Sequence, residues 1–142
     1  MPIRGFITEE IRERGERVGF RVETLAGERA TLAHVNLPGP PRVGRYGVDV
    51  AAFEAVALPA LDAIRDDDVV IIDEIGKMEL ASRRFRDRVM DAFARRVRVV
   101  ATIQLAHDPF TDARRERADV EVVRVTTRQR DRLPRDVVGR LR

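Results

Sequence analysis

Residues 67–80 read DDVVIIDEIGKMEL. An acidic turn precedes four β-branched residues at 69–72, which are apolar on both faces, as expected of a central parallel strand. The strand runs into Asp73 and Glu74, and Gly76 then lets the chain turn sharply away. In open α/β sheets, ligands bind beyond the carboxyl ends of parallel strands. The stretch therefore predicts an α/β fold with a functional site at Asp73 and Glu74.

Upstream of this strand, the first third of the chain has the composition of antiparallel strands. Segments 3–13, 17–25 and 29–35 are rich in Val, Ile, Thr and Phe, and glycine-containing breaks at 14–16 and 26–28 separate them. Short breaks of this kind are typical of hairpins. We expect an antiparallel meander there.

A loop rich in proline and glycine follows the meander. Residues 36–47, NLPGPPRVGRYG, contain three prolines and three glycines. We expect no regular structure in this loop, and a loop of this length inside a small domain indicates a functional role.

Helices and strands alternate from residue 49 onward. Asp49 and Ser82 are predicted helix N-caps, and Pro59 is expected to kink or split the first helix. The resulting order αβαβαβα is the signature of an open α/β sheet. In chain order, the expected elements are helix 50–64, strand 69–72, a helix containing 85–93, a second buried strand at 97–103, helix 111–117, strand 120–125 and helix 134–141.

The composition is that of a globular protein. The 142 residues suffice for one domain, and 44% of them are hydrophobic and 36% charged. No apolar run approaches the roughly 20 residues that span a bilayer, and MPIRGFITEE lacks the apolar core of a signal peptide. The absence of cysteine excludes a disulfide framework and fits a cytoplasmic protein, which is the location we expect.

Charge is distributed unevenly along the chain. Residues 1–75 carry 9 basic and 14 acidic side chains, whereas residues 76–142 carry 18 and 10. A basic half can attract phosphates of nucleotides or of nucleic acid. The more ordinary interpretation, which we favour, is a solvated helix face formed by Arg83, Arg84, Arg86 and Arg88.

The two carboxylates have a functional and a structural interpretation. In a phosphate-hydrolysing site, Asp73 would hold Mg²⁺ through water, and Glu74 would orient the attacking water. Alternatively, the acids simply end the strand. Glu79 lies within reach of the same turn, where it either serves the site or pairs with an arginine such as Arg83. Thr102 and Gln104, which end the next strand, either contact phosphate or water or merely terminate that strand.

Several blocks of the chain resemble one family. IDEIGKMEL at 72–80, GFITEE at 5–10 and VGRYGVDV at 43–50 resemble the archaeal and bacterial nucleoside-triphosphatase family, which includes the human cancer-related nucleoside-triphosphatase. The resemblance covers essentially the whole chain. Further similar segments are 17–35, 58–64, 109–125 and 130–134.

The resemblance implies a P-loop NTPase-like (RecA/AAA-like) fold, a three-layer α/β sandwich with a mixed sheet. It also implies Mg²⁺-dependent hydrolysis of ATP, GTP and other nucleoside triphosphates to the diphosphate and phosphate. Asp73 and Glu74 would then form the Walker-B-like pair, with Asp73 linked to the metal and Glu74 as the catalytic base.

One part of the family pattern is not found in the sequence. The family begins with a strand, a GxxxxGK[ST] phosphate loop and a helix, but the single Gly-Lys here is Gly76-Lys77, followed by Met78. We therefore expect a domain of residues 1–142 that lacks the first strand and phosphate loop. The missing strand would lie between 97–103 and 119–125. Either the reading frame was started too late, which the intact catalytic block favours, or the gene is truncated.

The remaining candidates for nucleotide binding are Lys77, Arg45 and Arg42. Lys77 follows the carboxylates Asp73 and Glu74 in the chain, and the Arg45 guanidinium could bind a γ-phosphate through two hydrogen bonds. Tyr46 either stacks on a base or, more commonly for such a residue, anchors the loop. The segment TTRQRDRLP at 126–134 resembles the base-side loop of the family but reads Gln129-Arg130-Asp131 where Asn-Arg-Asp is usual.

Three functions follow from these observations. The leading one is a nucleoside-triphosphatase that, as these 142 residues, is weak or inactive alone. The others are a non-catalytic interaction domain and a nucleic-acid-binding module. A 5% aromatic content disfavours binding of single strands by stacking.

Overall fold

The computed structural model describes residues 2–126 and 130–141, and the chain divides into two compact units between Gln104 and Leu105. In chain order the elements are β1 (Ile3–Glu13), β2 (Glu16–Thr24), β3 (Arg29–His34), β4 (Arg42–Val43), β5 (Tyr46–Val48), α1 (Val50–Asp62), β6 (Val69–Ile75), the 3-10 helix η1 (Glu79–Ala81), α2 (Arg83–Ala94), β7 (Arg98–Ile103), α3 (Pro109–Arg115) and α4 (Leu133–Leu141).

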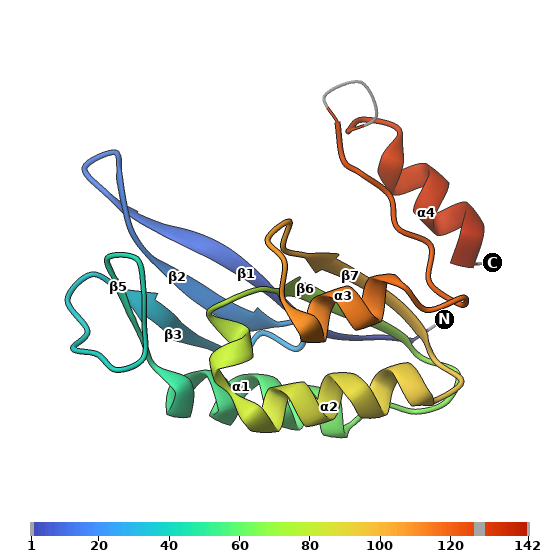
Figure 1. Cartoon of the computed structure of the whole chain (residues 1–142), viewed down its shortest axis with the longest axis horizontal. Coiled ribbons are helices and arrows are strands. Elements are labelled where there is room, and N and C mark those ends of the chain that lie inside the picture. The colour runs from blue at the N-terminus through green and yellow to red at the C-terminus, as the bar shows by residue number, and fades with distance from the viewer. Residues whose placement is uncertain (1, 127–129, 142) are drawn as a thin grey trace. The chain divides into compact units, whose positions relative to one another are not determined.

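The first unit contains a mixed sheet of seven strands in the order β4-β5-β3-β2-β1-β6-β7 (Figure 1). β1 pairs antiparallel with β2 and parallel with β6, and β6 pairs parallel with β7. The mixed sheet and the antiparallel strands of the first third are therefore confirmed. β6, the strand deduced from its β-branched run, lies between two parallel neighbours.

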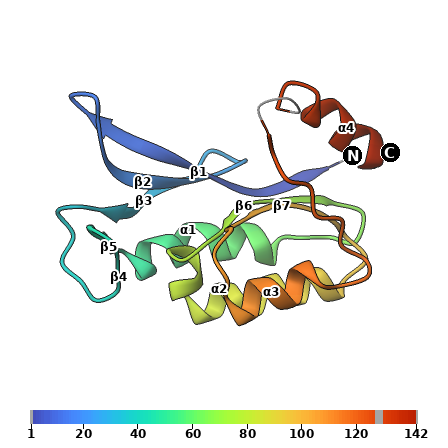
Figure 2. The same cartoon turned by 45° about the horizontal axis from the view of Figure 1, so that its top comes forward.

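Helices α1 and α2 lie side by side on one face of the sheet (Figures 1 and 2). Phe6 of β1, Phe53 of α1 and Phe85 of α2 meet edge to face there, with ring centroids 5.3 to 5.9 Å apart. All three side chains are at most 1% exposed. Such aromatic pairs contribute about 1 kcal/mol each beyond their burial, so this cluster fixes both helices against β1.

Both predicted N-caps are confirmed. Asp49 accepts a hydrogen bond of 2.9 Å from the Ala52 N–H, and Ser82 accepts one of 3.0 Å from the Phe85 N–H. Pro59 does not split α1, which continues through it, and the alternative of a kink stays a prediction. The expectation of no regular structure in the proline-rich loop was wrong, because the loop contains the short hairpin β4–β5.

The predicted strand at 120–125 is wrong, because residues 120–126 have no regular secondary structure. A strand needs a partner for its backbone groups, and the second unit contains no strand among its described residues. Val122, Val123 and Val125 are exposed.

β7 also differs from the expectation of a buried strand. It ends the sheet, and Arg98 and Thr102 on it are exposed. A strand with a neighbour on one side only keeps more of its surface accessible to water.

Two arginines of α2 pair with acids of the preceding helix. Arg88 Nε lies 2.5 Å from Asp62 Oδ1 and Arg84 Nη1 lies 4.0 Å from Glu54 Oε1. Arg95, which caps the end of α2, lies 2.9 Å from Asp66. The two pairs formed by Arg84 and Arg88, called the α1–α2 ion pairs below, agree with the solvated-face interpretation and neutralise part of the basic stretch. A helical layer on the opposite face of the sheet, which a three-layer sandwich requires, stays a prediction. The absence of the family's first strand also stays a prediction.

Candidate active site at the carboxyl end of β6

Asp73 and Glu74 lie near the carboxyl end of β6, where its pairing with β7 changes register. Ile72 pairs with Ala101 and Ile75 pairs with Ile103, so two residues of β6 oppose the single residue Thr102. A bulge of this kind redirects side chains and breaks the simple alternation of faces along a strand. It places both carboxylates at the same end of the strand.

The Asp73 carboxylate is held from the neighbouring strand. The Thr102 hydroxyl donates a hydrogen bond of 2.6 Å to Asp73 Oδ1. From the sequence, Thr102 was only one of two polar residues at a strand end. Its contact with Asp73 depends on the parallel register of β6 and β7, which local sequence patterns do not reveal.

The Glu74 side chain folds back over the turn that follows β6. A Cβ built on Gly76 would lie 3.0 Å from Glu74 Cδ and 3.2 Å from Glu74 Oε1. Partial burial, and then the negative charge of Asp73, raise the pKa of Glu74 above its usual value. A carboxylate with a raised pKa is a better proton acceptor near neutral pH.

Glu79 is the third carboxyl group of this region, and it is buried, with only 3% of its surface exposed. Burial raises the pKa of Glu79 to about 8, and the charges of Glu74 and Asp73 act in the same direction. Backbone N–H groups of Glu79 and Gly76 hydrogen-bond to the carboxyl and oppose that rise. The described part of the chain shows no ion pair between Glu79 and the exposed Arg83, and the nearby charges that act on Glu79 are those of Glu74 and Asp73.

The donor set at this strand end fits Mg²⁺. Among residues 2–126 and 130–141, no group of three or more His, Cys, Asp or Glu side chains is arranged to enclose a metal ion. Mg²⁺ does not need such a cage, because it retains waters and is held by one or two carboxylates together with substrate phosphates. Asp73 and Glu74 supply carboxylate oxygens of that kind, and their mutual repulsion favours a nearby cation.

The predicted phosphate ligands lie in two different places. Lys77 is exposed in the turn directly after β6. Arg42 donates hydrogen bonds of 3.0 Å to the Leu37 carbonyl and 2.8 Å to the Arg45 carbonyl, so its guanidinium braces the β4–β5 hairpin.

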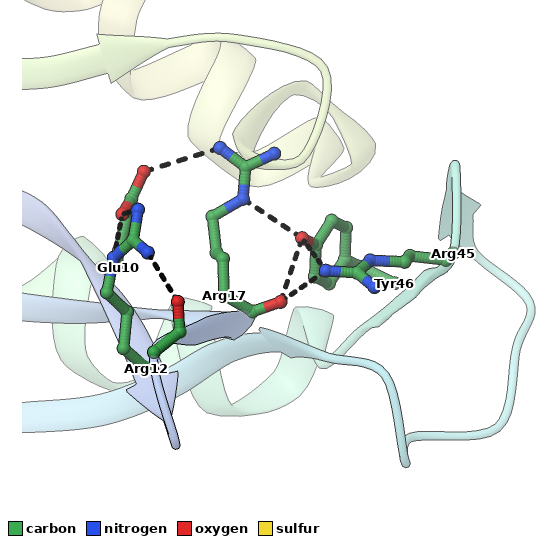
Figure 3. Close-up of polar contacts among 6 residues, drawn as sticks. Glu10, Arg12, Arg17, Arg45 and Tyr46 are labelled. Carbon is green, nitrogen blue, oxygen red and sulfur yellow. Dashed lines mark hydrogen bonds and ion pairs between the residues drawn. The ribbon is translucent and has the colours of Figure 1, made fainter.

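Arg45 belongs to a cluster on the β1–β2 hairpin and the β4–β5 hairpin (Figure 3). Its guanidinium donates to the Arg17 carbonyl and, at 3.3 Å, to the Tyr46 hydroxyl. Arg17 Nε donates to the same hydroxyl at 3.0 Å, while Arg17 Nη1 donates to Glu10 at 3.3 Å. Hydrogen bonds from the two arginines lower the pKa of Tyr46.

Tyr46 anchors its loop, as the more common interpretation proposed. It is 6% exposed, and its ring packs edge to face on Phe20 at 5.4 Å. The ring therefore has little surface available for stacking on a base. Of the predicted base-side loop, Gln129 lies outside the described residues, and the Arg130 N–H donates a hydrogen bond of 2.9 Å to the Thr126 carbonyl.

The mixed sheet places the chain among α/β proteins, a class in which ligands bind beyond the carboxyl ends of parallel strands. The sequence profile described as NTPase matches residues 1–138. The chain therefore belongs to this NTPase family.

Similar proteins come from distant organisms. The nucleoside-triphosphatase THEP1 of Thermotoga sp. (strain RQ2) is 42% identical over 139 residues, and the match covers 97% of this chain and 80% of that protein. The human cancer-related nucleoside-triphosphatase is 40% identical, with the same two coverages.

Solved structures support the fold. The crystal structure of THEP1 from the hyperthermophile Aquifex aeolicus matches with a TM-score of 0.89 at 36% identity, covering 98% of this chain and 83% of that one. The solution structure of a human cancer-related nucleoside triphosphatase matches with a TM-score of 0.83 at 38% identity, covering 99% and 82%. The mixed α/β sheet is thus the fold of these relatives.

Proposed function

We propose that the chain hydrolyses nucleoside triphosphates, ATP and GTP among them, to the diphosphate and phosphate at the carboxyl end of β6. The observation that carries the proposal is the pair Asp73 and Glu74 at a bulge, with Asp73 hydrogen-bonded to Thr102 and Glu74 half-buried above Gly76. The names of the relatives, nucleoside-triphosphatases of bacteria and humans, support this activity.

Glu74 is the proposed catalytic base. Phosphoryl transfer depends mainly on positioning and electrostatics, so the carboxylate has to orient a water for in-line attack on the γ-phosphorus. The raised pKa of Glu74 improves its ability to accept a proton from that water as the P–O bond forms.

Asp73 is the proposed metal-linked carboxylate. When bound with the nucleotide, Mg²⁺ would neutralise charge on the β- and γ-phosphate oxygens. Asp73 would contact a water of the ion's hydration shell, and Thr102 engages only Oδ1, which leaves Oδ2 for that contact.

Phosphate binding is the weak part of the site. The 142 residues contain no Gly-x4-Gly-Lys segment, and its row of backbone N–H donors would supply most of the contacts to phosphate. Lys77 is the nearest proposed replacement along the chain, with Arg42 and Arg45 in the β4–β5 hairpin as further candidates. We therefore propose that this chain alone binds nucleotide poorly and turns it over slowly.

The direct test is phosphate release with Mg-ATP and Mg-GTP for the wild type, Glu74→Gln and Glu28→Gln. Glu28 is exposed in a turn and serves as the matched control. We expect activity to be lost in Glu74→Gln and retained in Glu28→Gln. Undetectable turnover in a folded wild type would instead favour a non-catalytic interaction domain.

A second measurement separates binding from chemistry. A fluorescent nucleotide is titrated into this chain and into a version extended upstream by a strand, a phosphate loop and a helix. We expect at least tenfold tighter binding by the extended version, since the loop adds several charge-assisted hydrogen bonds. Equal affinities would contradict the proposed role of that loop. Oligonucleotide binding that falls steeply with salt would point to nucleic acid.

A further inference from the structure

Thr102 occupies an unusual position for a residue that faces a site. It lies on β7, the last strand of the sheet, and its side chain is exposed. The hydroxyl is nevertheless committed to Asp73, with an oxygen-to-oxygen distance of 2.6 Å. This is the distance typical of a strong hydrogen bond from a hydroxyl to an ionised carboxylate.

The hydrogen bond between Thr102 and Asp73 leaves acceptor atoms on both side chains available for a ligand. A threonine hydroxyl has one hydrogen and two lone pairs, and its hydrogen is used by Asp73 Oδ1. Within residues 2–126 and 130–141, two lone pairs on Thr102 and the second carboxylate oxygen of Asp73 remain without a donor. All of them are acceptors, which suits the hydrogens of metal-bound water rather than a bare phosphate.

We propose that Thr102 is a positioning residue that fixes the Asp73 carboxylate for the hydrated Mg²⁺ of the bound nucleotide; this inference rests on the function proposed above. An aspartate free to change rotamer loses that freedom when it engages a metal, and this loss weakens binding. A partner that has already fixed the rotamer removes most of that loss. Groups that orient metal-linked carboxylates in this way commonly change metal affinity roughly 10- to 100-fold when they are removed.

The positioning role of Thr102 can be tested without disturbing the fold. Because Thr102 is exposed on an edge strand, its hydroxyl carries no core packing. Thr102→Val keeps the β-branched shape and strand propensity while removing the donor. Thr102→Ser keeps the donor. Thr31→Val, at an exposed threonine on β3, is the matched control.

The first measurement needs no metal and no turnover. Three-bond couplings to the Asp73 side-chain carboxyl carbon, measured by NMR, report whether its χ1 angle occupies one rotamer. We expect one dominant rotamer in the wild type, Thr102→Ser and Thr31→Val, and averaging in Thr102→Val. Equal averaging in the wild type and in Thr102→Val would overturn the positioning role.

The second measurement addresses the metal. Mn²⁺ binding in the presence of ADP is followed by electron paramagnetic resonance for the same variants. We expect about tenfold weaker Mn²⁺ binding in Thr102→Val, recovery in Thr102→Ser and no change in Thr31→Val. An unchanged affinity in Thr102→Val would overturn the link to the metal.

The two measurements separate this inference from the proposed function. If neither this chain nor the version extended upstream binds Mn²⁺ with nucleotide, the metal role of both Asp73 and Thr102 is overturned, whatever the rotamer result. If Mn²⁺ binds equally well in all variants, the proposed metal site survives and the role of Thr102 does not.

Discussion

A Cβ built on Gly76 would lie 3.0 Å from the Cδ of Glu74, so a methyl group at position 76 would press on the side chain of the proposed catalytic base. Gly76→Ala should push the Glu74 carboxylate aside and lower phosphate release about tenfold or more, because the attacking water loses its orientation. The displaced group is the end of a flexible side chain, so unfolding free energy should fall by only about 1 kcal/mol. Phosphate release and urea unfolding measure the two effects.

The matched control for that variant is Gly139→Ala. Among the described residues, no atom lies within 4 Å of a Cβ built on Gly139, which is a helical residue. This substitution should stabilise α4 by roughly 0.5–1 kcal/mol and leave activity unchanged. Full activity in Gly76→Ala would show that the position of Glu74 above the turn is irrelevant to catalysis.

Glu79 should make stability fall as pH rises. Its pKa is about 8 when folded against an ordinary value of 4.5, so between these pH values the folded protein binds more protons than the unfolded chain. The stabilising contribution of the neutral carboxyl is complete below about pH 4.5 and is lost as pH rises through 8. Glu79→Gln cannot ionise and should be more stable than wild type by a few kcal/mol near pH 8.

Urea unfolding at several pH values between about 5 and 8.5 checks this prediction. The difference between Glu79→Gln and wild type should grow steadily over that interval. A difference independent of pH would mean that Glu79 ionises normally in the folded protein. Glu28→Gln, at an exposed turn, should show no such trend.

Gly5 should be among the least replaceable residues of β1. Its φ is +119°, and a Cβ there would lie 1.9 Å from the backbone oxygen of Ile71 on β6. Gly5→Ala should therefore separate the two strands and lower unfolding free energy by more than roughly 3 kcal/mol.

Gly27 provides the comparison, because its φ is +98° but no atom of the described residues lies within 4 Å of a Cβ built there. Gly27→Ala should lower unfolding free energy by roughly 1–2 kcal/mol from backbone strain alone. Equal losses in the two variants, measured by thermal unfolding, would contradict a steric role for the β1–β6 contact.

Ser82 links the start of α2 to α1. It accepts a hydrogen bond from the Phe85 N–H and donates one of 2.6 Å to Glu54 Oε2. Ser82→Ala should lower unfolding free energy by roughly 2 kcal/mol, since the cap is lost and the Glu54 carboxylate loses its donor. Ser82→Thr should retain most of the stability. A double-mutant cycle with Glu54→Gln isolates the contact between the side chains.

Local patterns were sufficient for the strand that carries the site. The β-branched run before Asp73 and Glu74 predicted a buried parallel strand, and the caps Asp49 and Ser82 predicted where helices begin. These features depend on neighbouring residues, which a sequence displays directly.

Features formed between distant segments were not predictable in the same way. The burial of Glu79 depends on how η1 packs, and the contact of Thr102 with Asp73 depends on strand register. The valine-rich 120–125 segment has strand propensity, but propensity produces no strand without a partner. Tyr46 and Arg17 are 29 positions apart and meet only because two hairpins lie together.

The α1–α2 ion pairs also reduce the long-range electrostatic field that the arginines of this protein produce. Arg88 and Asp62 are 26 positions apart, on opposite sides of the chain's division into an acidic and a basic half, yet their charges cancel across two helices. At about 0.15 M ionic strength, screening extends over about 8 Å, so such close pairs weaken only modestly. The long-range field that would draw an anionic ligand inward is thus smaller than the count of arginines implies, and it arises from residues outside these pairs.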